Sequence, residues 1–140
     1  MPSHPSAVLV RRGAVALVLA AALTACSHSD NTAAATHDKA CRTFEMLAGA
    51  SADQAPPKVA NAAERGGWNA DRLGALLSPV ADAALRAGLV YGLSDSDYAV
   101  FRDVRNSATT VQNELTTGFH GSDVSALKMS ITEEQNACSD

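Results

Sequence analysis

Apolar residues recur at every third or fourth position through most of this chain, and this spacing constrains its fold more than any other feature. The pattern is clearest in the stretches that begin near Leu73, Tyr98 and Val124. Hydrophobic residues make up 46% of the sequence but aromatic residues only 4%, so a core has to be built mainly from Ala, Leu and Val. Because alanine is the strongest helix former and no strand-like alternation occurs, we predict an all-α domain.

The spacing predicts a small helical bundle of four main helices plus one short helix, with antiparallel neighbours. The first main helix should run from Asp38 to Gly49. A linker, Ser51 to Pro57, should follow and end at a Pro-Pro stop. The short helix should then run from Pro57 to Arg65, with proline at the favoured first position.

Proline leaves two structures open for the third helical region, which begins at Trp68. Pro79 either kinks a single helix there or starts a second helix that Ser78 caps. After a glycine-bounded turn, the serine and aspartate residues at 94–97 predict the start of a long helix that ends before Gly118. The last helix should begin at Ser122 or Asp123.

The first 26 residues carry a targeting signal. Arg11 and Arg12 form a positive segment, and Gly13–Ala25 is an uncharged run of 13 residues, too short to span a bilayer as a helix. This run closes with Leu23-Thr24-Ala25-Cys26, an aliphatic residue and two small residues before a cysteine. The pattern resembles the lipobox of bacterial lipoproteins.

The resemblance implies that the Cys26 sulfur receives diacylglycerol, that cleavage follows Ala25, and that a fatty acid such as palmitate acylates the new amino terminus. The protein would then be held on the extracytoplasmic face of the cell membrane as part of the cell envelope. The alternative is an ordinary secretory signal with a coincidental cysteine. A twin-arginine signal fits less well, since Gly13-Ala14-Val15 lacks the large apolar pair that such signals resemble.

These features divide the chain into three segments: a signal peptide at 1–25, a lipidated cysteine with a flexible tether at 26–37, and a helical domain at 38–140. The tether is predicted from the small and polar residues Ser27 to His37, which show no apolar period.

Cys41 and Cys138 remain after lipidation of Cys26, an even pair in an oxidising compartment. Both lie on core-facing stripes, which predicts a structural disulfide between the first and last helices. The alternative is a redox site or a thiol nucleophile. We expect neither, because the two cysteines are far apart in sequence and no histidine is expected beside them.

Charge excludes one class of partner. Removal of Arg11 and Arg12 with the signal leaves nine basic residues against 15 acidic ones, a net charge of −6. Because nucleic acids repel acidic proteins, we predict no nucleic-acid binding.

No residue pattern specifies a reaction, a metal or a cofactor, and we expect the protein not to be an enzyme. His120 is the only histidine expected within the fold, in a turn where solvation is the usual state. No histidine spacing typical of a metal site and no G-x-S-x-G motif occurs. The acids of the later helices are interpreted as helix caps and solvated faces; they are Asp95, Asp97, Asp103, Glu114, Glu133 and Glu134.

The function that remains is a non-catalytic interaction module that engages an envelope or extracellular protein. Trp68 and Phe119 are its candidate contact residues, because aromatics in glycine-bounded connections can anchor interfaces; a buried core position is the alternative for Trp68. An enzyme acting on envelope polymers would need a cleft with two converging acids. A carrier of a hydrophobic ligand would need a large cavity, which the Ala-rich stripes argue against.

Overall fold

The computed structural model describes residues 19–66, 68–118 and 120–139, with side-chain surroundings from residue 32 onward. The chain forms two compact units, Met1–Asn31 and Thr32–Asp140. The predicted all-α class is confirmed, because the described residues form helices and no strand. The helices are α1 (Leu19–Ala48), α2 (Ala50–Glu64), α3 (Ala70–Gly88), α4 (Asp95–Thr117) and α5 (Gly121–Ala137).

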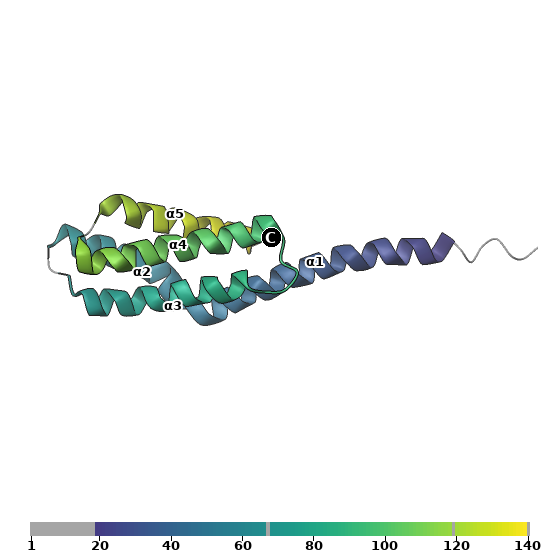
Figure 1. The fold of residues 1–140 in the computed structure, drawn as a ribbon, viewed down its shortest axis with the longest axis horizontal. Coiled ribbons are helices and arrows are strands. Elements are labelled where there is room, and N and C mark those ends of the chain that lie inside the picture. The colour runs from purple at the N-terminus through teal and green to yellow at the C-terminus, as the bar shows by residue number, and fades with distance from the viewer. Residues whose placement is uncertain (1–18, 67, 119, 140) are drawn as a thin grey trace, which may run out of the picture. The chain divides into compact units, whose positions relative to one another are not determined.

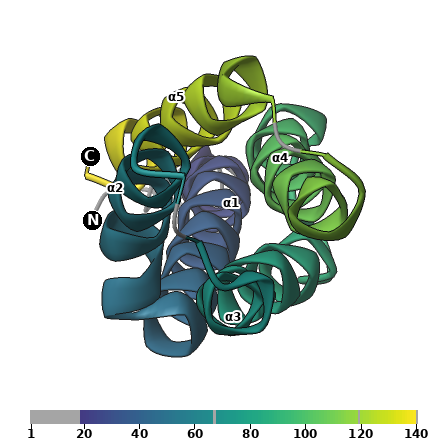
Figure 2. The ribbon, with the colours of Figure 1, turned by 90° about the vertical axis from the view of Figure 1, so that its left-hand side faces the viewer.

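Within the second unit the helices form a bundle. α3 packs along α4, α4 against α5, and α2 contacts both α3 and α5 (Figures 1 and 2). The core between them consists mainly of Ala, Val and Leu side chains, as the composition predicts, with one isoleucine and two aromatic rings. These rings are Phe44 of α1 and Phe101 of α4, whose centroids lie 6.0 Å apart.

The predicted pairing of Cys41 with Cys138 is confirmed. Their sulfur atoms are bonded at 2.07 Å and their Cα atoms lie 5.6 Å apart. The bond joins α1 to the residue that caps the C-terminal end of α5, so it ties the first and last helices together.

The prediction of a flexible tether at 26–37 differs from the structure, in which α1 continues as a helix through these residues. The second compact unit begins at Thr32. Ala33, Ala34 and Ala35 favour helix, and His37 contacts both Ala137 and Asp97 of the bundle. Polar residues without an apolar period can therefore be helical here, because tertiary contacts hold one end of the segment.

The predicted linker and Pro-Pro stop before residue 57 are wrong. α2 begins at Ala50 and carries Pro56 and Pro57 in its interior, which makes the expected short helix 15 residues long. Prolines at these positions remove two intrahelical hydrogen bonds. Burial of Pro56 together with Ala52, Ala55 and Val59 on one face offsets that loss. The bundle thus has five substantial helices instead of four main helices and a short one.

The later helices follow the sequence closely. α3 is a single helix with Pro79 inside it, so Pro79 does not divide the region into two helices. The Ser94 hydroxyl caps α4 by accepting a hydrogen bond from the Asp97 backbone N–H, and Gly118 ends that helix. α5 begins at Gly121, one residue before the predicted start. Among the described helices none is long and apolar enough to cross a bilayer.

Candidate functional site

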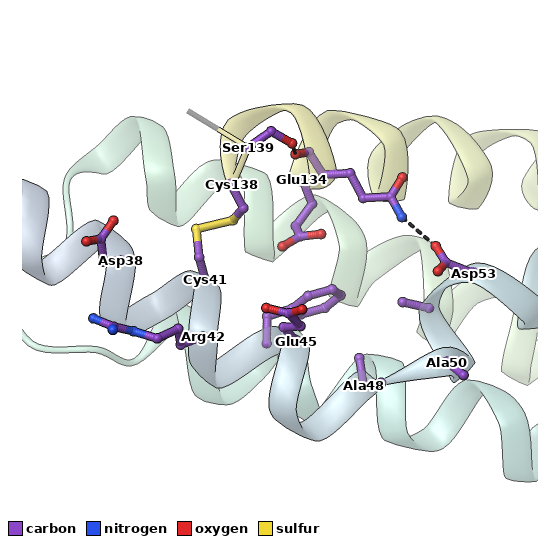
Figure 3. Close-up of a pocket in the computed structure, with 14 residues that line it drawn as sticks. Asp38, Cys41, Arg42, Glu45, Ala48, Ala50, Asp53, Glu134, Cys138 and Ser139 are labelled. Carbon is purple, nitrogen blue, oxygen red and sulfur yellow. Dashed lines mark hydrogen bonds between the residues drawn. A yellow bond between two sulfur atoms is a disulfide. The ribbon is translucent and has the colours of Figure 1, made fainter.

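A pocket of about 700 Å³ opens where α1 ends, α2 begins and α5 finishes (Figure 3). Its apolar wall includes Phe44, Ala48 and Ala52, and the disulfide bounds it on one side. The Ala-rich stripes argued against any large cavity, and this expectation is wrong. The helices do pack closely along their lengths, but the chain changes direction between α1 and α2 and leaves space against α5.

Gly49 makes this change of direction. Its φ of +49° lies in the left-handed region, where glycine is favoured over every residue with a Cβ. The Gly49 N–H closes α1 by donating to the Glu45 carbonyl at 2.9 Å. The turn brings acids of three helices to one pocket, with Glu45 on α1, Asp53 on α2 and Glu134 on α5.

Glu134 is the unusual acid of this group. Its side chain extends from α5 into the space above Glu45 (Figure 3), and only 4% of the residue is exposed. Its carboxyl group makes no hydrogen bond to the described residues and is open to the pocket, because no buried side-chain oxygen or nitrogen atom among them lacks a hydrogen-bond partner. Burial, followed by the negative charges of Glu45 and Asp53, raises its pKa to about 7. The group is therefore poised between its neutral and charged forms near neutral pH.

The remaining polar lining residues are more exposed. The Gln135 side-chain amide donates to the Asp53 carboxylate, which links α5 to α2 across the pocket (Figure 3). Asp38 and Arg42 also line the pocket, and Arg42 is the one cationic side chain among its described lining residues. Four carboxyl groups against one guanidinium give the pocket a negative potential once they are ionised.

A pocket with a negative potential attracts a cation. A positively charged group that enters it would supply the counter-charge that Glu134 lacks, and the apolar wall would accept the carbon skeleton of an organic cation. The only group of three metal-binding side chains among the described residues contains none of these acids and consists of His37, Cys41 and Cys138 at the edge of the pocket. The acids of the pocket are thus better suited to an extended cation than to one metal ion.

The interpretation of Glu134 as a residue on a solvated helix face is wrong, because the residue is only 4% exposed. α5 buries Leu127, Ile131 and Glu134 at helical spacing, and Cys138 continues the same stripe. The sequence therefore contains a signal for the burial of Glu134, because this residue lies on the helical stripe that was correctly predicted to face the core. The charge of the residue, and not its position, led to the wrong interpretation.

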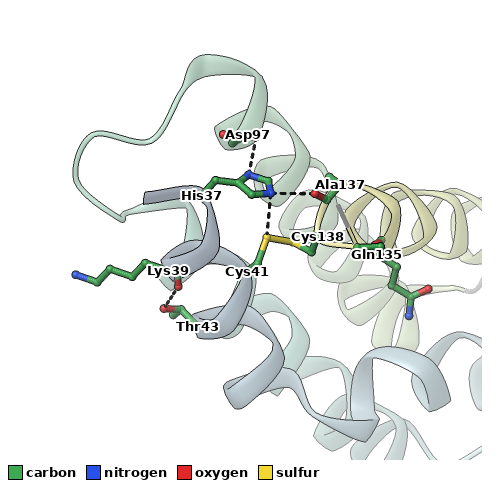
Figure 4. The surroundings of a disulfide bond; sticks show 9 residues. His37, Lys39, Cys41, Thr43, Asp97, Gln135, Ala137 and Cys138 are labelled. Atoms are coloured by element: carbon green, nitrogen blue, oxygen red, sulfur yellow. Dashed lines mark hydrogen bonds and ion pairs between the residues drawn. A yellow bond between two sulfur atoms is a disulfide. The ribbon is translucent and has the colours of Figure 1, made fainter. Parts of the chain in front are cut away.

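The expectation that no histidine lies beside the cysteines is wrong as well. His37 Nε2 lies 3.5 Å from Cys41 Sγ, and His37 Nδ1 lies 3.1 Å from an Asp97 carboxylate oxygen (Figure 4). Residues four apart share one face of a helix. The sequence would have shown this pair if the segment before Asp38 had been assigned to the helix.

The other candidate residues are not brought together in one site. Trp68 is half-buried and packs against the core, which agrees better with the core alternative than with a contact residue. Phe119 and the signal residues 1–18 lie outside the described residues, and so does the side chain of Cys26. The backbone N–H of His120, an exposed residue, donates to a Glu114 carboxylate oxygen.

The largest exposed apolar side chains are different residues from those predicted. Tyr91, in the turn between α3 and α4, is 99% exposed, and Leu89 and Tyr98 near it are also exposed.

Comparison with family models, with curated proteins and with solved structures finds no match to this chain.

Proposed function

We propose that this chain is an exported bacterial lipoprotein whose helical domain binds a positively charged ligand in the cell envelope. The lipobox-like residues Leu23–Cys26 support the location. The acid-lined pocket beside the disulfide supports the choice of ligand, which we propose to be an amine-bearing small molecule or a basic segment of an envelope or extracellular protein.

One observation carries the ligand class: Glu134 is only 4% exposed as a residue, and its carboxyl group opens into the pocket without a hydrogen-bond partner among the described residues. Partial burial of such a group disfavours its charged form, which a bound cation would stabilise. Proteins retain such unfavourable burial where function requires it, and carboxyl groups with perturbed pKa values in pockets are candidates for functional sites. The net charge of the mature chain favours the same class of ligand.

Removal of the anchor cysteine should change where the protein is found. We expect Cys26→Ala to leave an unprocessed or soluble form that no longer partitions into the detergent phase, because no other group in the first 26 residues can take the lipid. Detergent-phase partitioning with mass analysis of the amino terminus measures this. A mutant that partitions like the parent protein would show that the anchor is assigned wrongly.

Binding of a simple polyamine tests the pocket. We expect spermidine to bind the protein more tightly at pH 8 than at pH 5.5, because Glu134 is charged only above its raised pKa. Glu134→Gln should weaken binding at pH 8 by roughly 10- to 100-fold, the range for a charged hydrogen bond. Isothermal titration calorimetry at both pH values measures the two effects.

Glu133→Gln is the matched control, since it removes the same charge from the exposed neighbouring residue of α5. We expect it to change binding less than twofold. Equal losses in the two variants would mean that spermidine binds through overall charge, and would remove the support for this pocket.

The same acids favour a second candidate function, an enzyme that acts on an envelope polymer. Glu134 could serve as a general acid near neutral pH beside the exposed acids Glu45 and Asp53. This candidate predicts that the protein releases soluble fragments from purified peptidoglycan and that Glu134→Gln abolishes the release. The pocket is too polar to favour a carrier of hydrophobic ligands.

A further inference from the structure

A second group of side chains lies at the edge of the acidic pocket, where the disulfide forms part of the pocket lining. His37 Nε2 and the sulfur atoms of Cys41 and Cys138 all lie within 4.8 Å of one another (Figure 4). Two of these residues, His37 and Cys41, are one turn apart on α1, while Cys138 ends α5. The first and last helices of the bundle therefore both contribute to the group.

The imidazole ring is held in place from two sides. Nδ1 lies 3.1 Å from Asp97 at the start of α4, and Nε2 lies 2.9 Å from the Ala137 carbonyl oxygen and 3.5 Å from Cys41 Sγ. Metal-binding histidines in proteins are commonly oriented by a carboxylate on the nitrogen that does not bind the ion, as Asp97 is placed here on Nδ1.

We propose that the reduced chain binds one zinc-class metal ion through His37 Nε2, Cys41 Sγ and Cys138 Sγ, so that the ion replaces the disulfide as the link between α1 and α5. One imidazole and two thiolates form a donor set that suits Zn²⁺ and related soft or borderline ions. Tetrahedral zinc places such atoms about 3.3–3.8 Å apart, a separation within reach of this group once the sulfurs part.

Entry of the ion requires a reductant, for which a dithiol suffices. Its two sulfurs lose two protons and two electrons and become joined as a disulfide, while Cys41 and Cys138 gain them and become thiols. The ion then displaces both thiol protons. His37 exchanges its contact with the Ala137 carbonyl for the ion, and Asp97 stays on Nδ1. Three protein ligands leave the fourth position for water or another ligand.

Cobalt provides a direct probe. The full chain carrying Cys26→Ser has only two thiols, and it would be reduced with dithiothreitol, freed of reductant without air, and titrated with Co²⁺. We expect one Co²⁺ per chain with a thiolate-to-cobalt charge-transfer band, and displacement of Co²⁺ by Zn²⁺. The oxidised chain should show no such band. A reduced chain without the band overturns the proposal.

Three variants assign the ligands. His37→Ala should weaken cobalt binding by at least tenfold, and Asp97→Asn, which acts through His37, by roughly tenfold. His120→Ala is the matched control and should have no effect, since His120 belongs to a separate turn. Equal binding by His37→Ala and the parent chain would exclude this site.

If reduction alone unfolds the chain, the helix content measured by circular dichroism still tests whether the reduced chain binds the ion. In that case Zn²⁺ should restore the helical signal of the reduced parent chain and fail to restore that of His37→Ala, because an ion that binds only the folded state stabilises it. A reduced parent chain that stays unfolded with Zn²⁺ present would also overturn the proposal.

Discussion

Loss of the Cys41–Cys138 bond should lower the free energy of unfolding by about 3–5 kcal/mol. The bond closes a loop across 97 residues, nearly the whole folded unit, and long loops lose the most entropy when they are closed in the unfolded chain. A domain of this size has a total stability of about 5–15 kcal/mol. We therefore expect Cys41→Ser and Cys138→Ser each to shift the guanidinium unfolding midpoint strongly downward.

The double variant distinguishes one bond from two separate thiols. Because both single changes break the same bond, Cys41→Ser with Cys138→Ser should cost no more than about 0.5 kcal/mol beyond either alone. The loss should also match the effect of reducing the parent protein. Additive losses from the two changes would show that each cysteine stabilises the domain through its own packing.

The helical periodicity of the sequence predicts the helical bundle, and the two cysteines that remain after lipidation in an oxidising compartment predict its covalent link. α4 illustrates this, since a capping serine, two early acids and a closing glycine agree with an apolar stripe between them. The local signals and the tertiary packing favour the same helix there, so its boundaries can be predicted from the sequence.

The errors occur where local preference and tertiary packing conflict. Pro56 and Pro57 are signals for the end of a helix, yet α2 passes through both because Pro56 lies on its buried face. The segment at 27–37 has no apolar stripe of its own, and contacts of His37 with α4 and with the end of α5 are visible only in three dimensions. Sequence patterns do not contain such contacts.

The candidate sites were missed for a related reason. Their residues come from helices that are distant in sequence, and each residue alone has an ordinary explanation as a cap or a solvated charge. Glu45, Asp53 and Glu134 become a site only when Gly49 redirects the chain and α5 returns beside it. The spacing of the buried residues of α5 also fits burial of Glu134, but a charged residue taken alone indicates a solvated position.

The contribution of Glu134 to the stability of this domain should fall as the pH rises from about 4.5 to 7. The ordinary pKa of Glu134 is 4.5 and the folded state raises it to about 7, so the folded state binds this proton more tightly than the unfolded state does. The stabilisation is complete below pH 4.5 and is lost as the pH passes through 7. We expect a loss of about 1–3 kcal/mol, with one pKa unit equal to about 1.4 kcal/mol.

Glu134→Gln should remove this pH dependence, because a neutral amide of the same shape never acquires the buried charge. The variant should be more stable than the parent protein at pH 8 and close to it at pH 4.5, whereas Glu133→Gln should keep the slope of the parent. Urea unfolding of the parent protein and of the two variants at a series of pH values measures these effects. A slope that survives in Glu134→Gln would assign the titration to another group.

Spermidine connects this slope to the proposed function. A cation in the pocket favours the charged form of Glu134, so a saturating ligand should lower its pKa and stabilise the protein more at pH 8 than at pH 5.5. If the slope of stability against pH depends on Glu134 but spermidine leaves it unchanged, the raised pKa of Glu134 is supported and the proposed ligand class is wrong. If the pH dependence of stability and the effect of spermidine on it both depend on Glu134, the carboxyl that destabilises the free domain at neutral pH is the group that binds the cation.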